Sequence, residues 1–122
     1  MKFYRCDHCG NILTFVHSAG VPVVCCGQEM TELVPGTTDA AQEKHVPVAE
    51  IQGNAVHVKV GSVPHPMLEE HFIQWIALET NNGSQLKYLN PGEQPEVDFA
   101  LADGEKVEAV YEYCNLHGLW KS

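Results

Sequence analysis

One cysteine and four histidines have the types and spacing of a shared metal site. Cys114 and His117 are separated by two residues, and His45, His65 and His71 lie upstream. One thiolate and four imidazoles make five donors, one more than a structural zinc site normally uses. A set of this kind suits a metal of higher coordination number, such as iron. These residues therefore predict a redox iron site with a catalytic role.

A second candidate site consists of Cys6, Cys9, Cys25 and Cys26, with fifteen residues between Cys9 and Cys25. Disulfides fit poorly, because the total of five cysteines is odd and consecutive cysteines cannot bridge without strain. Four thiolates accept iron or zinc, and their spacing does not choose between the two metals. Because Cys25 and Cys26 are adjacent, we expect a distorted tetrahedron.

The charge balance excludes some classes of partner. Seven Lys and Arg residues stand against sixteen Asp and Glu residues, which gives a net charge of −9. Nucleic acid and anionic membrane surfaces are poor partners for such a chain, because both require basic clusters. Carboxylates gather late in the sequence, where a solvated face is the expected role and a docking surface for a partner protein the alternative: Glu93, Glu96, Asp98, Asp103, Glu105, Glu108 and Glu112.

The first residues run directly into the Cys6 motif, which leaves no room for the apolar segment of a signal peptide. No apolar run approaches the roughly 20 residues that a membrane-spanning helix needs. We therefore expect a soluble, cytoplasmic protein, in a compartment where thiols remain available to metals.

Residues 1–36 are expected to form a small first domain with short strands at 2–6, 12–16 and 21–24. A segment of this size cannot build an adequate apolar core, so bound metal should hold it together. The Pro- and Gly-containing stretch 34–39 is a plausible linker.

Residues 37–122 show the pattern of a β domain. Val56, Val58 and Val60 alternate with polar residues, so His57 should face away from the valines and is left out of the metal site. Residues 71–78 are apolar on both faces and read as a central strand. Roughly seven short strands separated by turns predict an antiparallel sandwich of immunoglobulin-like type.

The sequence context of the histidines favours their assignment as metal ligands. His65 stands between Pro64 and Pro66, which should hold it in a rigid, extended loop. His71 is expected at the start of a strand, and Cys114 and His117 in a turn closed by Gly118. A single histidine is more often a surface residue than a ligand, but the combination with Cys114 favours a metal site.

Six motifs together carry a resemblance to a known family. In order along nearly the whole chain they are Cys6-Asp7-His8-Cys9-Gly10-Asn11, Cys25-Cys26-Gly27, Glu43-Lys44-His45-Val46-Pro47-Val48, Gly61-Ser62-Val63-Pro64-His65-Pro66-Met67, Glu70-His71-Phe72-Ile73-Gln74-Trp75 and Cys114-Asn115-Leu116-His117-Gly118-Leu119-Trp120-Lys121. The sequence closely resembles desulfoferrodoxin, the two-iron form of superoxide reductase. Pro64 and Leu119 differ modestly from the residues that are most common at these positions in the family, and the donor residues are intact.

The resemblance implies a mainly β protein with a desulforedoxin-like domain over residues 1–36 and a catalytic domain over residues 37–122. It implies two iron ions per chain, one on Cys6, Cys9, Cys25 and Cys26 and one in a square pyramid with Cys114 axial and four histidines in the plane: His45, His65, His71 and His117. It also implies reduction of superoxide to hydrogen peroxide, a rubredoxin-like electron donor and a homodimer.

The resemblance further gives roles to two residues that otherwise would count as ordinary solvated charges. Lys44 would attract the superoxide anion and help to supply protons through water, and Glu43 would occupy the open position of the resting ferric site. Three other classes remain open: a zinc-ribbon interaction module, an electron carrier that uses only the thiolate iron, and a superoxide dismutase.

Overall fold

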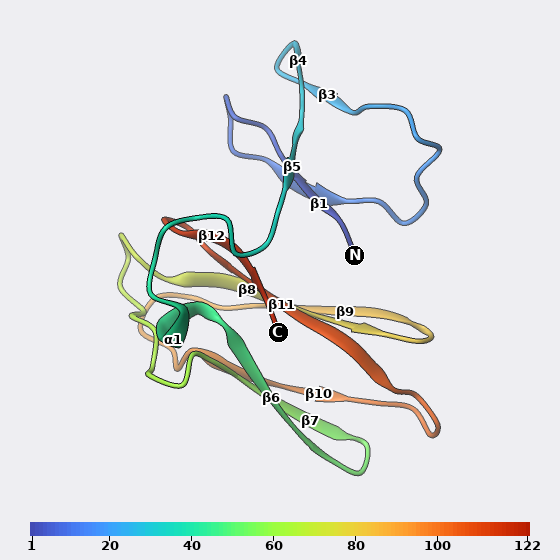
Figure 1. The fold of residues 1–122 in the computed structure, drawn as a ribbon, viewed down its shortest axis with the longest axis vertical. Coiled ribbons are helices and arrows are strands. Elements are labelled where there is room, and N and C mark those ends of the chain that lie inside the picture. Colours follow the sequence, from blue (N-terminus) through green and yellow to red (C-terminus); the bar gives the residue numbers. More distant parts are fainter. The chain divides into compact units, whose positions relative to one another are not determined.

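The computed structural model describes all residues from Met1 to Ser122, and the chain divides into two compact units, Met1–Val34 and Pro35–Ser122. Each unit is built from short antiparallel strands (Figure 1). No helix of the structure is long and apolar enough to cross a membrane.

The first unit contains a three-stranded sheet and a small hairpin. The sheet has the order β2-β1-β5, with β1 at Phe3–Arg5, β2 at Ile12–Thr14 and β5 at Thr31–Leu33. The hairpin pairs β3, Val24–Cys25, with β4, Gln28–Glu29. Only Phe3 and Cys6 are buried hydrophobic residues in this unit. An apolar core this small agrees with the expectation that metal binding supplies much of the folding free energy.

The predicted strands of the first unit are partly right. The segments 2–6 and 12–16 contain β1 and β2, but the segment 21–24 is not a strand except at its last residue. Val21 is exposed, and Pro22 interrupts the run. Strands β4 and β5 were not predicted from the sequence.

The second unit is a sandwich of two antiparallel sheets, which confirms the predicted fold class. One sheet has the order β10-β7-β6, with β6 at Pro47–Gln52, β7 at Ala55–Val60 and β10 at Glu96–Ala100. The other has the order β12-β11-β8-β9, with β8 at Ile73–Thr80, β9 at Gly83–Tyr88, β11 at Val107–Cys114 and β12 at Gly118–Lys121. Figure 1 shows the two sheets as separate layers, with the short helix α1, Gln42–His45, at one end.

The core of this unit lies between the two sheets. Val56, Val58 and Val60 of β7 are buried against Ile76 and Leu78 of β8. The strict alternation on β7 places His57 on the opposite face, as predicted, where its Nδ1 lies 2.6 Å from Asp98 Oδ1.

Two further expectations need correction. Strand β8 begins at Ile73 rather than at His71, because His71 instead exchanges backbone hydrogen bonds with Leu68 in a tight turn. Glu112, expected on a solvated face, is fully buried. Residue 112 shares its face of β11 with Val110 and Cys114, which point into the core, so the strand alternation outweighs the polarity of the carboxyl group.

Candidate metal centres

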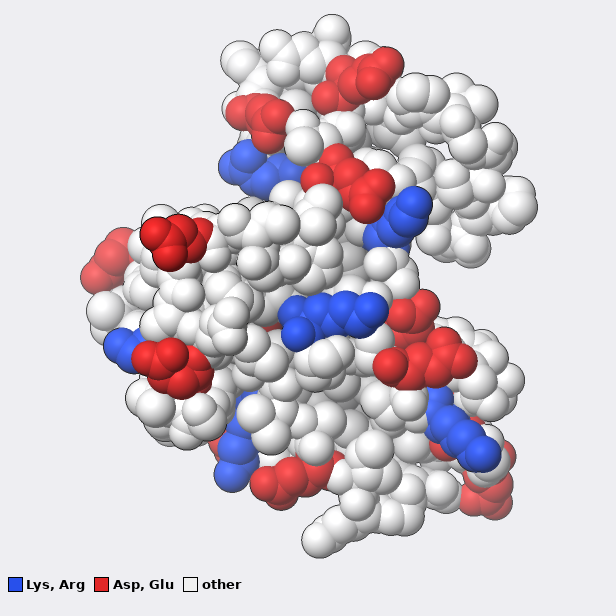
Figure 2. Space-filling view, viewed as in Figure 1, with Lys and Arg blue, Asp and Glu red and all other residues white.

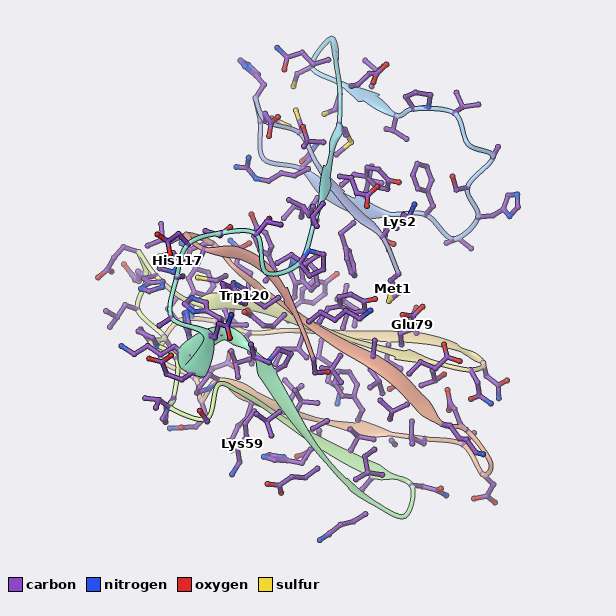
Figure 3. The ribbon with its side chains drawn as sticks, in the orientation of Figure 1. Met1, Lys2, Lys59, Glu79, His117 and Trp120 are labelled. Carbon is purple, nitrogen blue, oxygen red and sulfur yellow. The ribbon has the colours of Figure 1, made fainter.

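The five predicted donors of the second unit come together at the end of the sandwich that carries α1. His45 ends that helix, His65 and His71 lie on the connection between β7 and β8, and Cys114 and His117 flank the turn between β11 and β12. One donor atom from each residue lies within 4.8 Å of every other. Figure 3 shows His117 and Trp120 at this end, beside α1.

Two of the imidazoles are oriented by backbone carbonyls. His45 Nδ1 lies 2.8 Å from Ala41 O, and His65 Nδ1 lies 2.7 Å from Pro66 O, so each Nδ1–H donates to a carbonyl. The proton on Nδ1 leaves a lone pair on each Nε2. The two Nε2 atoms lie 3.1 Å apart and cannot hydrogen bond to each other in these tautomers. Two nitrogens bound at right angles to one ion, with bonds of about 2.1 Å, would be about 3.0 Å apart. The spacing fits a cation between them.

The other two imidazoles support the same interpretation. His117 Nδ1 lies 3.1 Å from His45 Nε2 and 3.8 Å from Cys114 Sγ. His71 Nε2 is buried without any hydrogen-bond partner. A buried polar nitrogen with no partner is costly unless a ligand satisfies it, and a metal ion would do so here.

The electrostatics of the group favour neutral imidazoles, the form that binds metals. Burial lowers the pKa of His65 to about 4, and burial also lowers the pKa values of His45 and His71. Burial raises the pKa of the Cys114 thiol, whereas the backbone N–H groups of His117 and Leu116 lower it. Since the thiolate is the form that binds metal, a cation among these donors would stabilise it.

Two residues that sequence reasoning did not single out hold this group in place. The side chain of Asn115 accepts a hydrogen bond from Phe72 N at 2.9 Å and donates one to Glu70 O at 3.1 Å, which ties the Cys114 turn to the segment of His71. Trp120 stacks on His45 with ring centroids 5.0 Å apart and donates from Nε1 to His117 O at 3.0 Å. The sequence could have indicated both residues, because Asn115 directly follows Cys114 and Trp120 lies three residues after His117.

Glu43 and Lys44 are exposed on α1, directly before His45. Burial is the main cause that lowers the pKa values of His45 and His71, and the positive charge of Lys44 is the smallest of the further causes in both cases. Glu43 O accepts hydrogen bonds from Val63 N at 3.0 Å and from Ser62 Oγ at 3.3 Å. These bonds fix the backbone of α1 to the segment that carries His65.

The four remaining cysteines form a second group in the first unit. Their sulfurs lie within 4.8 Å of one another, with Cys9 Sγ 3.6 Å from Cys25 Sγ and Cys25 Sγ 4.0 Å from Cys26 Sγ. Sulfurs at the corners of a regular tetrahedron with metal–sulfur bonds of about 2.3 Å would be about 3.8 Å apart. The spacing of the four sulfurs fits a metal ion bound by four thiolates.

The local backbone explains how two consecutive cysteines reach one ion. Cys26 has a φ of 53° and is the only residue other than glycine with a positive φ. The left-handed conformation costs an L-residue roughly 1–2 kcal/mol. It turns the chain sharply between β3 and β4, and both sulfurs remain within reach of the same point.

The comparisons with known proteins agree along the whole chain. The family model described as "Desulfoferrodoxin" matches residues 37–122, and the model described as "Desulfoferrodoxin, N-terminal domain" matches residues 1–33. A desulfoferrodoxin from Syntrophotalea carbinolica is 50% identical over 122 residues, covering 100% of this chain and 95% of the relative. One from Nitratidesulfovibrio vulgaris is 50% identical over 121 residues, covering 99% of this chain and 94% of the relative.

Among solved structures, a superoxide reductase from Treponema pallidum matches with a TM-score of 0.81 and 46% identity, over 93% of each chain. A superoxide reductase from Giardia intestinalis, described as a 1Fe form, matches with a TM-score of 0.58 and 35% identity, over 66% of this chain and 95% of that chain. The chain belongs to the desulfoferrodoxin family, with two iron sites in each chain.

Proposed function

We propose that this protein is a superoxide reductase that takes one electron from a donor and converts superoxide, with two protons, to hydrogen peroxide. The assembly of four imidazoles and Cys114 around one point carries the proposal. Structural neighbours that are themselves named superoxide reductases support it. Residues 37–122 would form the catalytic domain and residues 1–36 the domain of the tetrathiolate iron.

The residues of the chain supply the donors and the surroundings of the reaction. We assign His45, His65, His71, His117 and Cys114 as ligands of the catalytic iron, which in its ferrous form would supply the electron for superoxide. Five donors are one fewer than an octahedral ion accepts, so a small anion can approach. Cys6, Cys9, Cys25 and Cys26 would hold the other iron, and four thiolates around it would leave no such free position.

Lys44 would attract the substrate and deliver protons through water. The protein carries a net charge of −9, and Figure 2 shows basic side chains interspersed with acidic ones on the face displayed. Charges farther away than about 8 Å are largely screened at physiological salt, so the local potential around Lys44 decides the approach of an anion. Glu43, on the preceding position, would cover the free side of the oxidised site.

The donor, the assembly state and the compartment belong to the same proposal. Membership of the desulfoferrodoxin family supports a rubredoxin-like electron donor and a homodimer. None of the five cysteines forms a disulfide, and four of them lie in the first unit. Thiols that remain available to metals support a reducing compartment such as the cytoplasm.

Counting products tests the reaction. A dismutase yields one peroxide for every two superoxide anions and releases oxygen, whereas a reductase approaches one peroxide for each superoxide and consumes its donor. With a reductant that regenerates ferrous protein, we expect a peroxide yield near one per superoxide, little oxygen release and matching donor oxidation. Stoichiometric oxygen release without donor consumption would exclude the reductase assignment and favour a dismutase.

A further inference from the structure

Asn11 donates hydrogen bonds to two different sulfurs of the tetrathiolate group. Its backbone N lies 3.5 Å from Cys9 Sγ, and its side-chain Nδ2 lies 3.6 Å from Cys25 Sγ. One residue therefore contacts both halves of the site, the loop of Cys6 and Cys9 and the hairpin of Cys25 and Cys26.

The backbone holds this residue firmly beside the sulfurs. Cys6 N donates to Asn11 O at 2.9 Å, and Gly10 N donates to Cys6 O at 2.9 Å. Gly10, with a φ of 84°, makes the turn that brings Asn11 back towards Cys6. From this position the side-chain amide group of Asn11 reaches Cys25.

The donor on Cys25 differs in kind from the donors on the first two cysteines. Cys6 Sγ accepts from Cys9 N at 3.4 Å, and Cys9 Sγ accepts from Asn11 N, so both receive backbone N–H groups that no substitution short of proline removes. Cys25 Sγ receives its N–H group from a side chain. This contact can be removed without touching the backbone.

A hydrogen bond to a thiolate changes the energy of the two redox states unequally. Reduction adds one negative charge to a tetrathiolate iron site, much of it on the sulfurs, and hydrogen bonds to charged acceptors are stronger than bonds to less charged ones. Hydrogen bonds to the sulfurs are among the factors that set the potentials of thiolate iron sites. A donor on sulfur therefore stabilises the reduced state more than the oxidised state.

We propose that the side-chain amide of Asn11 raises the reduction potential of the tetrathiolate iron by donating a hydrogen bond to Cys25. Asn11 is thus a positioning and tuning residue of this centre, and its role depends on the proposed function only in that iron occupies the four-cysteine group. The exposure of Asn11 limits the effect, because water can partly replace a lost donor.

The test is a redox titration of the full-length, iron-loaded protein, followed by the visible absorption of the ferric tetrathiolate. Asn11→Leu removes the donor at similar size, and Asn11→Asp replaces it with an acceptor that carries a negative charge. Thr14→Val is the matched control, because it removes a 2.6 Å hydrogen bond to Lys2 O in the same unit without touching a sulfur.

For Asn11→Leu we expect a two- to fivefold fall in the equilibrium constant for reduction, equal to a potential lower by about 18 to 41 mV for a one-electron couple. The potential of Asn11→Asp should fall further, and acidification that protonates the introduced carboxyl should restore part of the lost potential. The sulfur-to-iron absorption band of both variants should move to longer wavelength. Thr14→Val and the other iron of the same chain should keep their wild-type potentials.

Three results would overturn the proposal. The first is an unshifted reduction potential in Asn11→Leu at full iron content. The second is a higher reduction potential in Asn11→Asp than in the wild type. The third is a reduction potential that falls as far in Thr14→Val as in Asn11→Leu, which would indicate general loosening of the unit. If Asn11→Leu fails to load iron, Asn11→Ala, which also removes the amide donor and adds no charge, decides in its place. Absence of any one-electron titration at this centre in the wild type would instead refute the iron assignment itself, and is readily distinguished from an unshifted titration.

Discussion

His45 and His65 show how single backbone carbonyls prepare a metal site. Because Ala41 O and Pro66 O each accept an Nδ1–H, the tautomer of both rings is set, and both Nε2 lone pairs point to the same place. Hydrogen bonds of this kind orient ligand rings and make them better donors. The low pKa of His65, about 4, keeps that ring neutral at any pH at which the protein is expected to work.

Lys44→Ala should slow the second-order reaction with superoxide about tenfold at low ionic strength and flatten its dependence on salt, because the proposed contribution is electrostatic attraction. Pulse radiolysis at several salt concentrations measures both quantities. Lys59→Ala is the matched control, since it removes the same charge from β7, where Figure 3 shows Lys59 away from His117. Equal effects of the two substitutions would contradict a specific role for Lys44.

Glu112 gives a prediction for stability as a function of pH. Burial raises the pKa of this carboxyl well above its ordinary value of 4.5, and neither of its oxygens has a hydrogen-bond partner. Above pH 4.5 the unfolded chain releases a proton that the folded chain retains, so the free energy of unfolding falls as the pH rises. The slope for one proton reaches about 1.4 kcal/mol per pH unit.

Glu112→Gln keeps the shape of the side chain and removes this titration. Its stability relative to wild type should therefore increase steadily from pH 5 to pH 8. Urea unfolding of both proteins at equal iron content, followed by tryptophan fluorescence, provides the measurement. Parallel pH profiles would show that Glu112 is already ionised in the folded protein.

At the scale of elements, the contact between α1 and the β7–β8 connection decides the geometry around His45. Gly61 has a φ of 82°, and a Cβ placed on it would lie 2.7 Å from Glu43 O and 2.8 Å from the carbonyl carbon of Lys44. A side chain at this position would push α1 away. Only glycine permits both the backbone conformation and the close approach.

Gly61→Ala should destabilise the second unit by about 2 kcal/mol or more and disturb the spectrum of the five-donor iron site. Gly53→Ala is the matched control, because Gly53 also has a positive φ, 58°, but nothing lies within 4 Å of its added Cβ. Thermal unfolding and ferric absorption spectra of both variants give the comparison. A Gly53 variant as damaging as the Gly61 variant would mean that the backbone conformation alone is responsible.

Strand alternation predicted β7 and the outward direction of His57 because that signal is local. The start of β8 was misplaced, since Leu68 and His71 pair with each other in a way that depends on the whole connection. The burial of Glu112 was missed because its charge suggested exposure to solvent, whereas its face of β11 points to the core. Asn115, Trp120 and Gly61 act through contacts distant in sequence, which spacing does not reveal.

For the whole molecule, the two metal groups draw on separate sets of residues. Cys6, Cys9, Cys25 and Cys26 belong to the first unit, and the five other donors belong to the second. The second unit also contains the main hydrophobic core. Neither group therefore requires a donor from the other unit.

A fragment of residues 37–122 should fold, bind one iron and reduce superoxide, with the tetrathiolate centre acting as an accessory. Iron analysis and the rate with superoxide, compared with the full-length protein, test this expectation. Loss of reactivity in a fragment that is folded and loaded with iron would show that the first centre takes a direct part in the reaction.

The spans of the two donor groups along the chain also determine when each can be filled during protein synthesis. The sulfurs of the first group are all present once Cys26 has been made, whereas the second group remains incomplete until His117, 91 residues later (117 minus 26). At about 5–20 residues per second, this interval lasts roughly 5 to 18 seconds. The ribosome can thus present a finished thiolate site to the cell's metal pool while the catalytic site still lacks both donors of its final turn, so the thiolate site can be filled first.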